Sequence, residues 1–138
     1  MIADSANMVK ESDETNNALA GNQITIRMPD LTMTAVSGPA SASTGKTITV
    51  SNAVLAAASA GNAGYFYVGI YLSTDNVITT ADTAIGYRYV SSLSSGVLSA
   101  ADTVITIPTS VAPGVYYLGV IADYANAVKE TDETNNSL

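Results

Sequence analysis

The stretch Tyr65-Phe66-Tyr67-Val68-Gly69-Ile70-Tyr71-Leu72 decides the class of fold. In an extended chain, successive side chains point to opposite faces. One face would then carry the apolar set Phe66, Val68, Ile70 and Leu72, and the other face the set Tyr65, Tyr67, Gly69 and Tyr71. This alternation, with its β-branched and aromatic residues, predicts a strand that buries one face in a core.

Working outward, further stretches show strand patterns, and turn formers separate them. They are Gln23–Met28, Leu31–Val36, Thr47–Val54, Thr83–Val90, Thr103–Ile107 and Val115–Ala122. The Ala-rich stretch Leu55–Ala60 is compatible with a single helical turn. Strands at this spacing with little helix predict an all-β antiparallel sandwich, with roughly 100 residues in each unit.

Composition narrows the classes of function. The net charge of −7 argues against nucleic acids and anionic membrane surfaces as partners. The chain has no Cys and no His, so zinc and copper lack their usual ligands and a catalytic triad lacks its base. No apolar run is long enough to span a membrane. We therefore expect a protein without catalytic activity.

A second feature is a motif written twice. Residues Ile2–Leu19 and Ile121–Leu138 match at 14 of 18 positions without a gap, at an offset of 119 residues. The two copies hold eight of the twelve acidic residues, so the acidity of the chain is local. Such a repeat predicts a tandem array with a period of 119 residues.

The repeat also predicts the domain boundaries. In the first copy, the motif leads into the strand-like stretch Gln23–Met28, whose residues Ile24, Ile26 and Met28 share one face. We expect residues 1–28 to be the tail and last strand of a preceding repeat, and residues 29–138 to be a sandwich without its own last strand. A spare strand and an open sheet edge favour strand donation, within one chain or between chains.

Two groups of acidic and amide side chains are candidates for calcium, which prefers oxygen ligands. Asp75, Asn76 and Asp82 lie in one predicted loop, and Asp123, Asp132 and Glu133 lie in the second copy of the motif. The same residues also suit plain turns and a solvated acidic loop. In a head-to-tail array, the two groups would lie at opposite ends of each unit and meet at a junction, where they could share Ca²⁺.

The tyrosine stripe Tyr65, Tyr67 and Tyr71 is the third candidate site. Exposed aromatic side chains can stack on a sugar or pack against a protein partner. Packing of these rings beneath loops or beside a neighbouring strand is the simpler interpretation, and the absence of Trp weakens the case for sugars.

Five short motifs resemble the CARDB domain, the cell-adhesion-related repeat of bacterial and archaeal surface proteins. They are Pro29–Thr32, Tyr71–Asp75, Asp82–Gly86, Ala112–Tyr117 and Glu133–Asn136. The resemblance covers about Pro29 to Leu138, and the first nineteen residues resemble the family's terminal motif again. It implies an immunoglobulin-like β-sandwich of about seven strands, repeated in tandem on extracellular proteins, without known catalysis.

The sequence therefore predicts a non-catalytic extracellular structural module of a tandem-repeat surface protein or filament. Its partners would be copies of itself or neighbouring repeats, joined by strand donation and stiffened by calcium. The alternative is an adhesion domain that binds a surface protein or a glycan through its loops or its tyrosine face.

Overall fold

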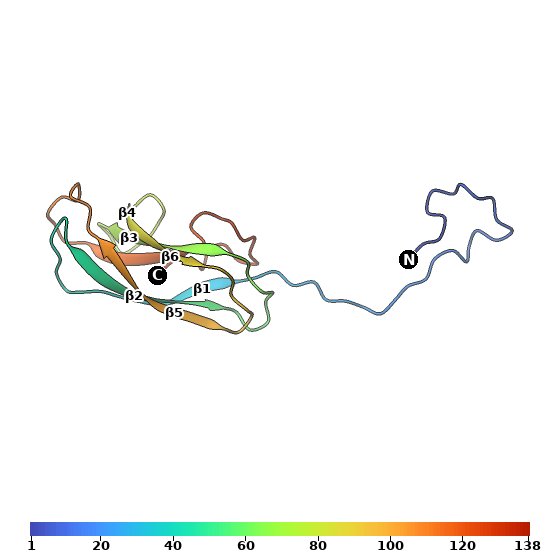
Figure 1. Ribbon diagram of the computed structural model, residues 1–138, viewed down its shortest axis with the longest axis horizontal. Helices are drawn as coiled ribbons and strands as arrows, with labels where there is room; N and C mark the ends of the chain where they lie inside the picture. Colours follow the sequence, from blue (N-terminus) through green and yellow to red (C-terminus); the bar gives the residue numbers. More distant parts are fainter.

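The computed structural model describes residues 1–138 as two packed antiparallel sheets and an N-terminal segment that leads away from them (Figure 1). The six strands are β1 (Leu31–Ser37), β2 (Thr47–Ala56), β3 (Phe66–Ser73), β4 (Thr83–Val90), β5 (Leu98–Thr106) and β6 (Tyr117–Ala122). One sheet has the order β1-β2-β5 and the other the order β4-β3-β6. The predicted all-β sandwich is confirmed, with six strands in place of about seven. No helix of the structure could cross a membrane.

Each sheet is organised around its central strand. In the first sheet β2 pairs along its whole length with β5, from Thr47 opposite Thr106 to Leu55 opposite Leu98. In the second sheet β3 pairs with β4 on one side and with β6 on the other. Because β3 and β6 are antiparallel, the loop after β3 and the loop after β6 lie at opposite ends of the sandwich.

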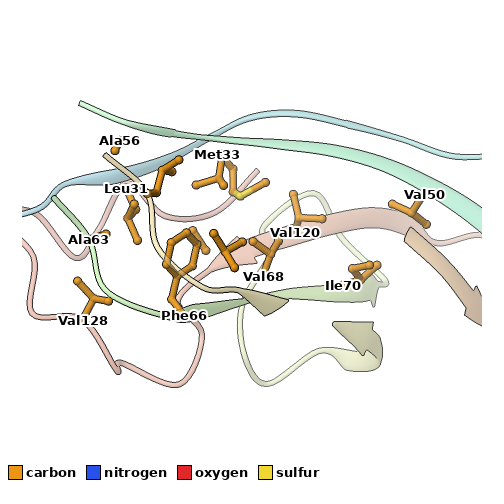
Figure 2. Close-up of a cluster of buried hydrophobic side chains, with 14 of the residues drawn as sticks. Leu31, Met33, Val50, Ala56, Ala63, Phe66, Val68, Ile70, Val120 and Val128 are labelled. Atoms are coloured by element: carbon orange, nitrogen blue, oxygen red, sulfur yellow. The ribbon is translucent and has the colours of Figure 1, made fainter. Parts of the chain in front are cut away.

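The core lies between the sheets and follows the alternation seen in the sequence. Phe66, Val68 and Ile70 of β3 are fully buried, and Phe66 and Val68 point toward Leu31 and Met33 of β1 (Figure 2). Seventeen buried residues form one cluster from all six strands and the adjoining loops. The opposite face of β3 carries the tyrosines, as the period of two predicts.

Two predicted strands and one possible helical turn need correction. Gln23–Met28 is not a strand, because this stretch has no neighbouring strand to bond with, and an isolated strand leaves its polar backbone to water. The strand predicted at Thr103–Ile107 begins at Leu98, since the register with β2 extends over residues 98–102 as well. Leu55–Ala60 is not helical: β2 continues to Ala56, and a turn follows.

The N-terminal segment makes few contacts with the sandwich. Residues 1–28 contain turns and one isolated bridge, Ile2 with Ala18, but no strand. The segment joins the sandwich at Met28, whose carbonyl oxygen accepts the N–H of Gly61 at 2.7 Å. Figure 1 shows the rest of it extending from the end of the sandwich where β1 begins.

Candidate functional site: the repeated acidic motif and the edge of β6

Both copies of the motif fold the same way, beginning with an aspartate in a left-handed turn. Asp4 and Asp123 have φ angles of 37° and 45°, and Asn7 and Asn126 have φ angles of 52° and 50°. Asp and Asn tolerate this region better than other residues with a side chain. Each aspartate then accepts two backbone N–H groups: at 2.9 and 2.7 Å for Asp4, and at 3.0 and 2.7 Å for Asp123.

The second half of the motif repeats equally closely. Glu14 and Glu133 accept the backbone N–H three residues earlier, at 2.8 and 2.9 Å. Asp13 and Asp132 each bind the N–H and the hydroxyl of the threonine two residues later, and these bonds lower the pKa of both carboxyl groups. The first copy has no sandwich beneath it. The loop conformation is therefore determined by its own side-chain-to-backbone bonds.

The second copy adds contacts that fix it to the sandwich. Glu130 accepts the backbone N–H of Leu31, the first residue of β1, and the side-chain amide of Asn136 at 3.0 Å. The N–H of Thr131 donates to the carbonyl of Pro29 at 2.8 Å. Asn135 donates to the carboxylate of Asp30 at 2.9 Å. The acidic loop thus holds the start of β1 to the end of β6.

Burial changes the titration of Glu130. Only 4% of this residue is exposed, and desolvation raises the pKa of its carboxyl group to about 7, with Glu133 and Asp123 adding repulsion. The bonds from Leu31 and Asn136 oppose this rise but do not cancel it. The Oδ1 atom of Asn136 is buried without a partner. If the amide turned over, its oxygen could accept a hydrogen bond from the O–H of a neutral Glu130.

Beyond the loop, the chain returns along the outer edge of β6. The N–H of Ala122 donates to the carbonyl of Asn136, and Val120 and Leu138 exchange two bonds at 2.9 and 3.0 Å. The remainder of this edge, toward Tyr117, has no strand beside it. It borders an apolar groove of about 340 Å³ at the far end of the sandwich, lined by Ile48, Leu72, Ile107, Val111, Tyr116 and Leu118 among others.

The residues predicted to bind calcium are in two separate places. Asp75 accepts the N–H of Val77 at 2.8 Å, and Asp82 accepts the N–H of Thr79 at 2.7 Å, beyond the end of β3. Asn76 is exposed in the same loop. Asp123, Asp132 and Glu133 lie at the opposite end, and their carboxylates accept N–H groups of their own loop. Neither place brings three or more acidic side chains together.

The predicted tyrosine stripe is part of a larger aromatic face. Tyr67 contacts Tyr87 edge-on with ring centroids 5.5 Å apart, and it contacts Tyr89 at 5.3 Å. Tyr71 is buried beneath Tyr124, edge-on at 6.3 Å. Gly69 makes this packing possible, because a Cβ there would meet the two rings at 2.6 and 2.8 Å.

Sequence reasoning missed several functional candidates. Tyr87 and Tyr89 alternate in their own strand, and that period could have placed them beside the predicted stripe. Tyr124 is one of the four positions at which the two motifs differ, where the first copy has Ser5. That difference marks a residue that contacts the sheet. Nothing in the sequence distinguished Glu130 from its acidic neighbours.

The model of the CARDB family matches residues 28–138. The curated proteins give no match. A CARDB domain from Pyrococcus furiosus, solved in complex with di-metal ions, is similar at a TM-score of 0.57 and 23% identity, over 83% of this chain and 91% of that chain. A domain described as that of a cell surface protein from Methanosarcina acetivorans is similar at a TM-score of 0.56 and 21% identity, over 80% of this chain and 87% of that chain.

Proposed function

Because the chain belongs to the CARDB family, a family of adhesion-related domains found in cell-surface proteins, we propose that it is a non-catalytic structural and assembly module. In this role it is one unit of a tandem-repeat surface protein or filament outside the cell. The observation that carries the proposal is the acidic motif, which folds identically in two places. The second copy is bonded to the sandwich, and the first copy lies in the N-terminal segment that leads away from it.

The position of the motif suits a junction between units. Its fixed copy holds the start of β1, so the segment entering the sandwich meets the acidic loop at one end. The loop with Asp75 and Asp82 lies beyond β3 at the other end. In a head-to-tail array, each acidic loop would face the Asp75 loop of a neighbour. A strand donated across the junction would then join the units mechanically.

Calcium is the second part of the proposal. Neither acidic group brings three acidic side chains together, so in this proposal the ion binds where two units meet and combine their oxygen ligands. The domain from Pyrococcus furiosus, which was solved with di-metal ions, supports metal binding as a property of a related fold.

A chain with two consecutive repeat periods tests the proposal. Small-angle scattering should give a stiff rod close to twice the length of one unit, and Ca²⁺ should narrow its distribution of shapes relative to EDTA. Calorimetric titration of the same chain with Ca²⁺ should give a heat of binding. A freely jointed pair of domains would contradict the structural role. The absence of any heat of binding would refute the calcium part of the proposal.

The aromatic face favours one alternative, an adhesion domain that binds a surface protein or a glycan. Tyr65, Tyr87 and Tyr89 are more than half exposed, and with Tyr67 they line a shallow open surface. Rigid aromatic rings are effective anchors for protein and sugar ligands. Binding to a glycan or cell-surface array that is lost in Tyr89→Ala would favour this role, and equal binding by the variant would count against it.

A further inference from the structure

We propose that the segment Ala20–Met28 of one copy of this chain pairs with the open edge of β6 in a second copy and covers the apolar groove beside it. This inference deepens the proposed assembly role and rests on it. The segment is exposed throughout: Ile24 and Ile26 are 76% and 82% exposed. The same segment follows the motif directly, and in the fixed copy the residues that end the motif already lie along β6.

The repeat supplies the direction of pairing. In the fixed copy, Leu138 pairs with Val120, and Leu19 is the equivalent residue of the first copy at the offset of 119. The bonds that join Met1 to Leu19 repeat the bonds that join Val120 to Leu138. A chain that continues from this position runs antiparallel to β6, toward Tyr117. Residues 20–28 are therefore the stretch that the motif directs onto this edge.

The part of this edge from Tyr117 to Gly119 lacks a partner. The N–H groups of Val120 and Ala122 point toward the returning chain, and the ladder alternates, so the N–H of Leu118 points the same way. No strand accepts it on that side. An unpaired strand edge of this kind is a template for another chain.

The core is also incomplete at this end. Val36, Ile48, Leu72, Val111 and Leu118 pack against the core cluster but are only partly buried. Four of these five line the groove next to β6. The missing cover is apolar and must lie along the edge of β6, which is where an added strand would place its inward side chains.

The register of the motif then places the apolar residues of the donor. In the fixed copy, Leu138 pairs with Val120 and Asn136 with Ala122. Continued without interruption, this register would place Ile24 opposite Val115 and Ile26 opposite Pro113. Both residues come just before β6, which begins at Tyr117, and both line the groove. The donor would therefore pair with the open part of β6 and lay its isoleucines beside the groove.

The donor must come from another copy. Met28 is held beside Gly61, and Pro29 beside Thr131, at the end of the sandwich where β6 finishes. Paired with β6, Met28 would lie near the opposite end, because nine extended residues span ~30 Å. A chain cannot hold Met28 at both ends, so its own segment cannot fill its own groove.

The test is light scattering with size-exclusion chromatography of the full chain over a range of concentrations. The wild type should form concentration-dependent oligomers. Ile24→Asp should weaken association by roughly a hundredfold, because it places a charge in an apolar groove. Thr25→Asp carries the same charge on the next residue, which faces solvent, and should associate like the wild type.

Three results would overturn the inference. The first is a wild type that stays monomeric, the second is equal association of Ile24→Asp and wild type, and the third is a loss confined to Thr25→Asp. The proposed function fails separately. A stiff two-repeat rod with monomeric single chains would leave the structural role intact and remove donation between copies. Single chains that form oligomers, together with a flexible two-repeat chain, would support donation between copies and remove the structural role.

Discussion

Glu130 should make the stability of the sandwich fall as the pH rises toward neutrality. Its carboxyl group is buried against the N–H of Leu31 and the amide of Asn136, and its pKa rises from 4.5 to about 7 on folding. Below pH 4.5 the group is protonated in both the folded and the unfolded chain. As the pH increases from there, only the unfolded chain releases the proton, so unfolding becomes more favourable. Above pH 7 both states are ionised and the effect is complete.

The size of the effect follows from the shift. Each unit of pKa corresponds to about 1.4 kcal/mol, which gives an upper value of about 3 kcal/mol. Part of the shift comes from repulsion by Glu133, which is exposed, and solvent screens that repulsion. We therefore expect an effect of about 2 kcal/mol. For a domain of this size, that is a decrease of roughly 8 °C in the unfolding midpoint between pH 4.5 and 7.5.

The assay is thermal or urea unfolding across this pH range, followed by tyrosine fluorescence because the chain has no Trp. Glu130→Gln resembles the protonated side chain, since its amide can donate to the unpartnered Oδ1 of Asn136. The variant should therefore lose the pH dependence and be the more stable protein at pH 7.5. Glu11→Gln changes the equivalent residue of the free copy and should behave as the wild type.

The result that would refute this reasoning is a wild type whose stability is flat or rises between pH 4.5 and 7.5. An equal slope in wild type and Glu130→Gln would refute it as well. Asp13 and Asp132 do not interfere, because their lowered pKa values mean that their contributions are lost only as the pH falls below the ordinary range for Asp.

Two further predictions concern the motif and the aromatic face. Asp123→Ala should destabilise the sandwich by about 2–4 kcal/mol in urea unfolding, because the buried N–H of Val128 and the partly buried N–H of Ala127 lose their acceptor. Asp4→Ala should leave the midpoint unchanged, and equal effects of the two variants would contradict the distinction between the copies. Gly69→Ala should lower the free energy of unfolding by about 1–3 kcal/mol, because its methyl group would collide with the rings of Tyr71 and Tyr124. The same change should alter the near-ultraviolet circular dichroism of the tyrosines, and an unchanged spectrum would argue against that packing.

Much of the fold could be predicted from local pattern. The alternation in Tyr65–Leu72 identified the buried face of β3, since Phe66, Val68 and Ile70 are all fully buried. The stretch Leu98–Asp102, which has no β-branched or aromatic residue, was not predicted as strand, because pairing with β2 rather than its own composition extends β5 to Leu98. The strand propensity of a stretch does not indicate whether a strand from elsewhere in the chain will pair with it.

In the candidate site too, local features could be predicted from the sequence, and contacts between distant parts of the chain could not. The repeat identified the acidic motif, and its loop is determined locally, so the sequence contained that information. The burial of Glu130 depends on the start of β1, 99 residues away in sequence, and no local pattern reports it. Gln23–Met28 has the pattern of a strand but no partner in the structure. That mismatch between pattern and state motivates the strand-donation proposal.

The account depends most on the claim that an added strand bonds to β6, and hydrogen exchange at the backbone amide of Leu118 measures it directly. The N–H of Leu118 points to the open edge, and an incoming strand would accept it. The account predicts fast exchange in dilute protein and strong protection at high concentration, with the protection lost in Ile24→Asp. Exchange at Leu118 that is independent of concentration would contradict it.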